Sequence, residues 1–427
     1  MGEEIRVEGL TKSFGRQMIW ADITLTLPPG EISVLLGPSG TGKSVFLKSL
    51  VGLLKPERGH IFIRDVDLVR CSERKLYQTR KLFGVLFQDG ALFGSMNLYD
   101  NIAFPLREHT RRREQEIRRI VLEKMEMVGL LGAEAKLPGE ISGGMRKRAG
   151  LARALVLDPE IILFDEPDSG LDPVRVAYLN QLIVDLNAQV DATFLIVTHD
   201  IGMARTVPDN LGLLFRRNLV MFGPREVLLT SDELVVRQFL DGRREGPIGM
   251  SEEKDQAQVE AELASLADGG PPAPGTGPNG AGGARVPPQL QPSPGMPVRQ
   301  AALRRQMRVA QLLHTLPAKA QEAIRQTLPP DLVAGAEVTP QRDSLPPAPP
   351  PLGQPADRQP GRTDPSRAPQ PEYPASGQVP PAGHLPAGHP PAARPRPRPY
   401  PADQAPPVRQ DAVREDGGRA TNGERQP

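Results

Sequence analysis

A glycine-rich loop near the N-terminus carries residue types suited to holding phosphate. Glycines let the backbone curl until several N–H groups face one anion at the start of a helix. The lysine places a positive charge against the β and γ phosphates of a nucleotide, and the following serine hydroxyl suits Mg²⁺. An apolar run precedes the loop and a helical pattern follows, as this motif requires. The residues are Gly37, Pro38, Ser39, Gly40, Thr41, Gly42, Lys43 and Ser44.

Two carboxylates and a histidine follow other apolar runs of the chain. Asp165 and Glu166 come directly after residues 161–164, and His199 follows residues 194–197. Because ligands bind at the carboxyl ends of strands in open α/β sheets, we expect these side chains to meet the phosphate loop. Asp165 is then predicted to hold Mg²⁺, directly or through water, and Glu166 to polarise the water that attacks the γ-phosphate. His199 is predicted to contact the γ-phosphate.

A second short loop also precedes a helix. Ser142, Gly143 and Gly144 lie just before a helix predicted to begin near Arg146. A helix start of this kind favours anions through its free N–H groups and its dipole. One chain with two such sites poses a puzzle, which is resolved if the second serves a nucleotide held by another subunit. Taken alone, a Ser-Gly-Gly turn is usually only a loop.

The elements that must position these residues follow an α/β pattern. Residues 32–36, 161–164 and 194–197 are short apolar runs, typical of strands buried on both faces of a parallel sheet. Residues 5–30 predict short strands, and residues 109–131 predict a helical insertion. A helix that packs on the sheet is indicated by the stripe of Leu47, Leu50, Val51 and Leu54.

Composition divides the 427 residues into a folded part and a tail. Only 12 of the 48 prolines lie before Ser251, so we expect one α/β domain in residues 1–246. Residues 247–297 are predicted to be an acidic segment followed by a Pro/Gly linker, and residues 298–328 a short helical island. Residues 329–427 hold too few large apolar groups to offset their ordering entropy, so we predict a disordered Pro-rich tail.

Charge and cysteine content exclude several classes of function. The net charge of +1 gives no global field that favours nucleic acid as a partner. The single cysteine, Cys71, excludes an internal disulfide framework and fits a reducing compartment. The N-terminus lacks the pattern of a signal peptide, and no run approaches the ~18 apolar residues of a membrane span. We therefore expect a cytosolic chain.

The helical island is the one patterned segment of the tail. It places Leu303, Met307, Ala310 and Leu313 on one predicted helix face, with arginines beside them. Such an apolar stripe inside a tail indicates an element that docks on a partner or stabilises a dimer. The alternative is a transient helix with no partner.

The order of these motifs resembles that of ABC transporter ATPases, and the resemblance covers residues 3–246. It implies a P-loop domain with a parallel core sheet, an antiparallel β subdomain and a helical subdomain. It also implies that Gln88 is the Q-loop and binds Mg²⁺ together with Ser44 and Asp165. By the same resemblance Phe14 stacks on adenine, although a Phe packed in the core is the alternative.

The resemblance also implies a dimer that uses both phosphate-binding loops. Proteins similar to this chain form head-to-tail dimers, in which two ATP molecules lie between the phosphate loop of one copy and the signature of the other. Ser142, Gly143 and Gly144 are then the signature, and Asp172 ends the D-loop beside the nucleotide. Ile141 and Met145 depart from the commoner LSGGQ signature. The serine hydroxyl and the glycine N–H groups remain, so we expect a working site.

Longer matches narrow the family. Residues 72–110, ISGGMRKRAGLARAL and VRQFLDGRREGPIG resemble the ATPases of Mce-type lipid importers. Residues 204–240 and LRRQMRVAQLLHTLP resemble the Mce-associated ATPases that energise uptake of sterols and fatty acids. The resemblance implies a membrane permease of the Mce/YrbE type, Mce lipid-binding proteins beyond it, and a peripheral place on the cytoplasmic face of the membrane. The alternatives are another cargo, such as an amino acid or a drug, and a soluble ABC factor that remodels ribosomes or DNA.

Overall fold

The centre of the fold is a six-stranded sheet, and the computed structural model describes residues 2–243, 246–249, 286–330 and 332. The strands are β3 (Ile32–Leu36), β6 (Phe83–Leu86), β7 (Ile161–Asp165), β8 (Thr193–Val197), β9 (Asn210–Phe215) and β10 (Asn218–Pro224). Their order is β10-β9-β3-β8-β7-β6, and all pairs are parallel except β9 with β10. Every residue of β3, β7 and β8 is buried, as their apolar runs predict.

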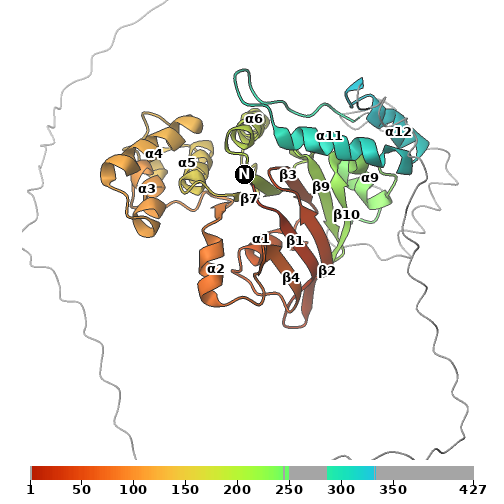
Figure 1. Cartoon of the computed structure of the whole chain (residues 1–427), viewed down its shortest axis with the longest axis horizontal. Helices are drawn as coiled ribbons and strands as arrows, with labels where there is room; N and C mark the ends of the chain where they lie inside the picture. Colours follow the sequence, from red (N-terminus) through yellow and green to blue (C-terminus); the bar gives the residue numbers. More distant parts are fainter. Residues whose placement is uncertain (1, 244–245, 250–285, 331, 333–427) are drawn as a thin grey trace, which may run out of the picture. The chain divides into compact units, whose positions relative to one another are not determined.

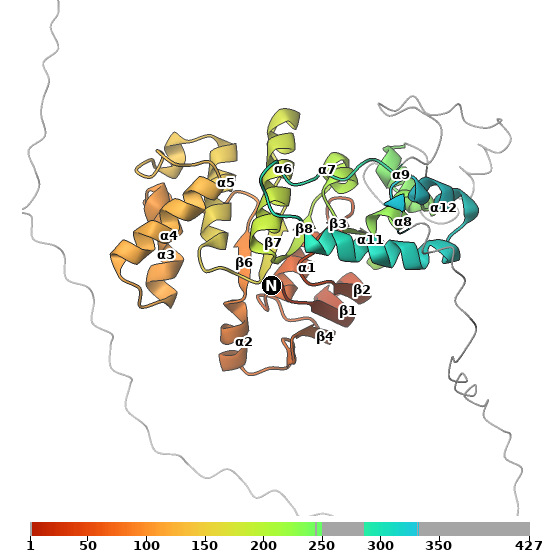
Figure 2. The same ribbon diagram turned by 45° about the horizontal axis from the view of Figure 1, so that its top comes forward.

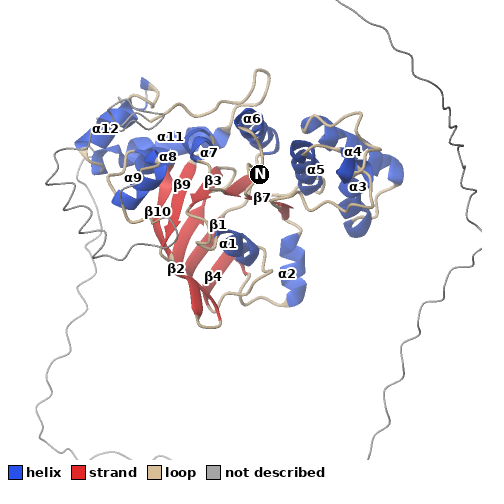
Figure 3. Cartoon of the chain, turned by 180° about the vertical axis from the view of Figure 1, so that it is seen from behind, coloured by secondary structure: helices blue, strands red, loops and turns tan. Residues whose placement is uncertain are grey.

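A second sheet is antiparallel and contains the N-terminal strands (Figure 3). Its strands are β1 (Ile5–Phe14), β2 (Gln17–Leu27), β4 (Arg58–Ile63) and β5 (Val66–Asp67). Inward residues of β1, such as Ile5 and Val7, alternate with exposed ones. They share a core with Phe46 of α1 (Lys43–Leu50), the helix that follows the phosphate loop. The predicted strands of residues 5–30 are therefore two long strands that pack against this helix.

The helices form two groups around the central sheet. In the first group, α2 (Glu73–Arg80) lies between β5 and β6 in the chain. The other members lie between β6 and β7, and they are α3 (Leu98–His109), α4 (Glu114–Met127) and α5 (Gly143–Leu155). Figure 2 shows α3, α4 and α5 together beyond β6. The second group is α6 (Pro173–Val190), α7 (Ile201–Thr206), α8 (Arg225–Leu229) and α9 (Leu234–Asp241). No helix in the described residues is long and apolar enough to cross a membrane.

A C-terminal arm, which we define as residues 286–330, packs on the same domain. It contains α11 (Gln300–Leu312) and α12 (Ala318–Arg325), and α11 lies beside the β9 side of the sheet (Figure 1). Val309 and Ile324 are buried in a small core that Leu229 of α8 also joins. The helices predicted in residues 298–328 are thus present and lie against the α/β domain of the same chain. The predictions for residues 250–285 and 333–427 fall outside the described residues.

A buried ionic cluster joins the arm to the start of β9. Asp209 is fully buried, and its carboxylate forms ion pairs with Arg299 and with Arg305. The Ile32 N–H and the Gln289 amide also donate to this carboxylate, at 2.9 and 3.0 Å. Burial, the largest single effect, would raise the pKa of Asp209, but the charges of Arg299 and Arg305 together with the hydrogen bonds from Ile32 and Gln289 hold the pKa below its ordinary value. Asp209 is therefore charged in the folded protein at neutral pH.

A second buried carboxylate lies at the start of β3. Arg308 of the arm binds both oxygens of Glu31, at 2.7 and 2.6 Å, in a bidentate pair. The Asn210 amide donates to the same carboxylate at 2.7 Å, and Glu31 is fully buried. The arm therefore neutralises two buried acids, which lie directly before β9 and β3.

The buried face of α11 differs from the predicted one. Leu303 and Met307, placed on the docking face by the apolar pattern, are 44% and 48% exposed. Ala310 and Leu313 of the predicted face are buried, and the buried face also carries Ala301, Arg305 and Val309. The prediction is wrong for Leu303 and Met307 because it assumed a wholly apolar partner, whereas buried Asp209 also lies against this helix and pairs with Arg305.

We predict that Asp209→Asn lowers the free energy of unfolding by about 3 to 5 kcal/mol, because it leaves buried arginine charges without their partner. Because the folded-state pKa is depressed, the stabilisation is complete above the ordinary value of 3.8 and is lost as the pH falls toward the folded-state value. The difference in free energy of unfolding between the wild type and Asp209→Asn should therefore shrink as the pH falls. Denaturant unfolding followed by circular dichroism, at neutral and acidic pH, measures it. A stability difference that does not change with pH would contradict the conclusion that buried Asp209 is charged.

Candidate functional site

The phosphate loop is held in shape by its glycines and by the antiparallel sheet. Gly42 is the N-cap of α1 with φ of 88°, in the left-handed region. A Cβ atom there would lie 2.9 Å from the ring of buried Trp20, so this position requires glycine for two independent reasons. The Lys43 ammonium donates to the carbonyl oxygens of Gly37 and Pro38, at 2.8 and 3.0 Å. Its positive charge therefore lies inside the curl of the loop.

Ser44 and Asp165 meet at the end of the sheet. The Ser44 hydroxyl donates to a carboxylate oxygen of Asp165 at 2.7 Å, although 121 residues separate them in sequence. Hard oxygen ligands of this kind fit Mg²⁺, which is held by one or two carboxylates together with substrate phosphates. The two side chains are close enough to share one ion, so the residues present fit a magnesium site. Gln88, the third predicted ligand, lies exposed two residues beyond β6.

Glu166 and His199 face each other beside this pair. A Glu166 carboxylate oxygen lies 3.7 Å from Nδ1 of His199, and the two side chains are 21% and 50% exposed. Glu166 has φ of 46°, a left-handed conformation that costs free energy in a residue with a Cβ. Its N–H donates to the Val197 carbonyl of β8 at 2.9 Å, which helps to hold that conformation.

Asp168 joins the two strands that carry these side chains, a role that the sequence did not indicate. The Thr198 hydroxyl donates to buried Asp168 at 2.6 Å and accepts from the Asp200 N–H at 2.9 Å. His199 therefore lies between two residues that are fixed by hydrogen bonds. The only available signal was the position of Asp168 directly after Glu166 and Pro167.

Lys147 of α5 is a second functional candidate that the sequence did not indicate. Its buried ammonium donates to the carbonyl oxygens of Glu166, Pro167 and Ser169, at 3.4, 2.8 and 2.5 Å. It also lies 3.2 Å from the Ser169 hydroxyl. Burial lowers the pKa of this lysine, an effect that the nearby carboxylates Asp168, Asp89 and Glu166 oppose. Lys147 thus joins the helix of the second loop to the segment that carries Glu166.

The second predicted anion site lies at the start of α5. Ser142 is the N-cap of this helix and accepts from the Met145 N–H at 3.3 Å, and Gly143 and Gly144 form its first turn. In the ribbon views α5 belongs to the helical group beyond β6, whereas α1 lies beneath the sheet (Figures 1 and 2). The structure therefore does not bring this loop to the phosphate loop of the same chain.

Two further predicted site residues have clear positions. Phe14 ends β1 and is 47% exposed, with the Lys12 ammonium 5.0 Å from the ring centroid, so it is not a core residue. Asp172 is the N-cap of α6, and its carboxylate accepts from the N–H groups of Val174 and Arg175 at 3.1 and 3.0 Å. Its hydrogen bonds in this structure thus serve the start of α6.

A phosphate loop between a parallel strand and a helix, with carboxylates at the end of another parallel strand of the same sheet, defines a P-loop nucleoside triphosphatase. The family model described as "ABC transporter" matches residues 20–169. A 70% identical relative, of which the chain covers 89%, is an ATP-binding protein of a transport system. The chain belongs to the ATP-binding subunits of ABC transporters, and it is an ABC-type ATPase.

Individual relatives differ in how much of the chain they match. The "probable ribonucleotide transport ATP-binding protein mkl" of Mycobacterium tuberculosis is 70% identical over 328 residues, which is 76% of this chain and 89% of the relative. The "intermembrane phospholipid transport system ATP-binding protein MlaF" of Haemophilus influenzae is 44% identical over 244 residues, 57% of this chain and 92% of the relative. The 328-residue match is longer than the domain that precedes residue 250.

A solved structure supports the fold independently. CbiO1 of Clostridium perfringens, described as part of the ABC transporter complex cbiONQ, superposes with a TM-score of 0.51 and 27% identity. The match covers 56% of this chain and 94% of that protein. The similarity therefore extends over nearly the whole of a single ABC cassette.

We predict that Lys147→Met lowers turnover about tenfold or more while ATP affinity changes little, because the segment holding Glu166 loses several hydrogen bonds. Steady-state hydrolysis and nucleotide-binding titrations measure the two quantities. Lys124→Met is the matched control, because Lys124 is equally buried but pairs with Asp158 on another part of the domain. Equal losses of turnover in both variants would indicate a general structural effect.

Proposed function

We propose that this chain binds MgATP at the edge of the central sheet and hydrolyses it to drive a membrane transporter for lipids. The observation that carries the catalytic part is the hydrogen bond between Ser44 and Asp165, with Glu166 and His199 beside it. Lys43 would contact the β and γ phosphates, and Ser44, Asp165 and Gln88 would hold Mg²⁺, which would neutralise charge on the phosphates. Phe14 stacks on the adenine.

The hydrolytic step follows from the positions of two side chains. Glu166 accepts a hydrogen bond from a water molecule and polarises it for attack on the γ-phosphorus. The bond between that phosphorus and the oxygen bridging to the β-phosphate breaks as the new P–O bond forms, which releases ADP and inorganic phosphate. His199 donates to the γ-phosphate and so orients it. Asp168 and Lys147 keep the segment around Glu166 in place.

The working unit that we propose is a head-to-tail dimer of this chain. Within one chain, Ser142 and the two glycines after it lie in the helical group, apart from the phosphate loop. In a dimer, the start of α5 from one copy completes the phosphate site of the other, and its N–H groups and dipole favour the γ-phosphate. Asp172 lies at the same dimer interface.

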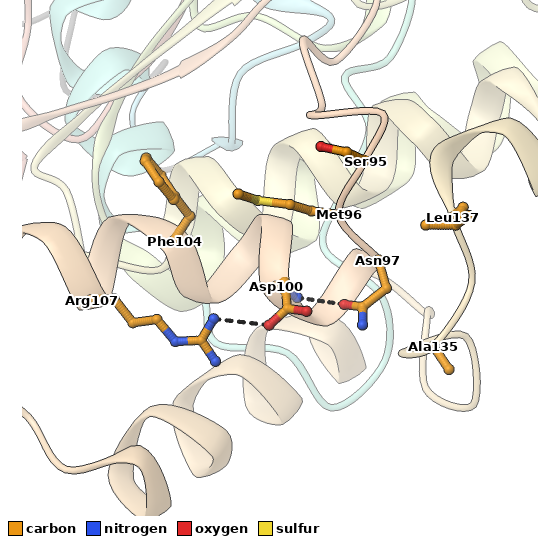
Figure 4. A pocket seen from close by; sticks show the side chains of 8 residues that line it. All are labelled: Ser95, Met96, Asn97, Asp100, Phe104, Arg107, Ala135 and Leu137. Atoms are coloured by element: carbon orange, nitrogen blue, oxygen red, sulfur yellow. Dashed lines mark hydrogen bonds and ion pairs between the residues drawn. The ribbon is translucent and has the colours of Figure 1, made fainter. Parts of the chain in front are cut away.

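The transport partner is proposed to dock beside the Q-loop. A hollow of 490 Å³ lies at the start of α3, ten residues beyond Gln88, and Figure 4 shows its lining side chains. Asp100 and Arg107 form an ion pair at 2.8 Å on one side, and Met96 and Phe104 provide apolar surface. A helix of a membrane permease that carries apolar side chains fits this surface.

Lipid cargo is supported by two kinds of resemblance. The motifs of this chain resemble those of Mce-type importers, and two MlaF relatives carry the name of a phospholipid transport system. The mycobacterial relatives are instead named for ribonucleotide transport, which makes that cargo the second candidate. The proposed partners are a permease of the Mce/YrbE type and, beyond it, Mce lipid-binding proteins. With these partners, the proposed location of the chain is the cytoplasmic face of the membrane.

We predict that Glu166→Gln retains MgATP binding but lowers the turnover rate by about a hundredfold or more, because the amide is a poor acceptor for the attacking water. Nucleotide binding is measured by titration and turnover by phosphate release. The variant should also populate a nucleotide-bound dimer, visible by light scattering. Turnover equal to that of the wild type would overturn the assignment of Glu166.

We predict that Met96→Glu weakens co-purification of the membrane partner while leaving ATP binding unchanged, because it places a charge in an apolar part of the hollow. The measurement is an affinity purification in detergent, followed by identification of the retained membrane protein and its bound lipid. Leu131→Glu is the control, since Leu131 is an exposed apolar residue outside the hollow. Retention of ribosomes in place of a membrane protein would favour a soluble remodelling factor.

A further inference from the structure

Helix α7 connects the carboxyl end of β8, where the candidate site lies, to the amino end of β9. It begins two residues after His199, which follows the carboxyl end of β8, and it ends at Thr206, just before the amino end of β9. Because β8 and β9 run in the same direction, α7 must return across the sheet. It has only six residues, or about 9 Å of helix, so a displacement at one end reaches the other.

The C-terminal arm binds the end of α7 that is remote from His199. The Leu290 N–H donates to the Thr206 carbonyl at 2.8 Å. The Gln289 amide donates to the carbonyl oxygens of Val207 and Pro208, at 3.1 and 2.9 Å. The last carbonyls of a helix have no partner within the helix, so these bonds satisfy groups that α7 leaves open.

The Arg205 carbonyl, one residue before Thr206 in α7, is held by an arginine that also contacts the arm. The buried Arg225 guanidinium donates to the Arg205 carbonyl and, at 2.7 Å, to the Pro287 carbonyl of the arm. Four consecutive carbonyl oxygens, from residues 205 to 208, are therefore fixed by the arm or by an arginine bound to it. Asp209, the next residue, is held by the buried arginines of the arm.

The N-terminal end of α7 is fixed from the catalytic side. Asp200 is its N-cap and accepts from the Met203 N–H at 2.5 Å. The Asp200 N–H donates to Thr198, which Asp168 holds in turn. His199 thus lies on a short rigid connection whose two ends are held by different elements.

We propose that the C-terminal arm is a positioning element for His199, acting through α7, so that turnover is highest when the arm is docked. This rests on the proposed role of His199 at the γ-phosphate. When the arm is released, the open carbonyls of α7 lose their donors and the helix loses its remote anchor. His199 then spends less time at the position from which it reaches the γ-phosphate, while the phosphate loop remains intact. Release of the arm therefore lowers kcat more than it changes KM for ATP.

The test uses Gln289→Ala in the full chain, with and without His199→Ala. We expect Gln289→Ala to lower kcat about three- to tenfold with KM within about twofold, because hydrogen bonds each contribute roughly a kcal/mol. In the His199→Ala background the same substitution should change kcat by less than about 1.5-fold, since the two residues act in series. Gln311→Ala is the matched control, because Gln311 is exposed on the outer side of the arm.

Three outcomes decide the proposal. Should Gln289→Ala prove poorly folded by thermal unfolding, Gln289→Met, which keeps the side-chain length but removes the amide donors to Val207 and Pro208, is measured in its place. Loss of kcat that is equally large in the His199→Ala background, or no loss at all, overturns the positioning role of the arm while leaving the proposed site intact. If His199→Ala alone turns over ATP at the wild-type rate, the role of His199 itself fails, and the inference fails with it.

Discussion

The parallel register of three strands is the constraint on which the site depends. Leu35 of β3 and Asp165 of β7 both pair with Val197 of β8, so the three strands end at the same level. Each strand then continues directly into a functional segment, which carries Ser44, Glu166 or His199. A shift of one residue in either pairing would move these side chains by about 3.3 Å and turn alternate residues to the other face. The hydrogen bond between Ser44 and Asp165 exists because the register is correct.

The left-handed backbone at Glu166 shows how the surroundings stabilise an unfavourable conformation. A non-glycine residue in this region costs of order 1 to 3 kcal/mol and persists only where its surroundings fix it. Here the Val197 carbonyl accepts from the Glu166 N–H, and Lys147 binds three carbonyl oxygens of the same segment. Because Lys147 lies on α5, five residues after Ser142, these hydrogen bonds join that helix to the segment that carries Glu166. The first half of one helix thus serves two different phosphate sites in the proposed dimer.

The sequence predicted the parts of the site that are local in the chain. The phosphate loop follows β3, Asp165 and Glu166 lie at the end of β7, His199 follows β8, and Ser142 precedes α5. It could not predict Lys147 or Asp168, because their partners come from another element and neither residue type is unusual there. Leu303 and Met307 of α11 were placed wrongly on its buried face for the same reason. Arg299 pairs with Asp209, 90 residues away, and Arg308 pairs with Glu31, 277 residues away. No local sequence pattern therefore shows that these arginines pair with buried acids.

The amino and carboxyl ends of the central strands lie close to each other because these strands are short. Glu31, which Arg308 of the arm neutralises, directly precedes β3, and Leu36 at the other end of β3 leads into the phosphate loop. Five residues of strand span about 17 Å, so the ionic cluster and the phosphates lie one strand length apart. Asp209 strengthens this connection because its carboxylate accepts from the Ile32 N–H while it binds the arm. Buried ion pairs contribute little net stability compared with apolar packing, but they fix geometry when every partner is present. The arm therefore fixes the amino ends of β3 and β9, and through them the strands that position the catalytic groups.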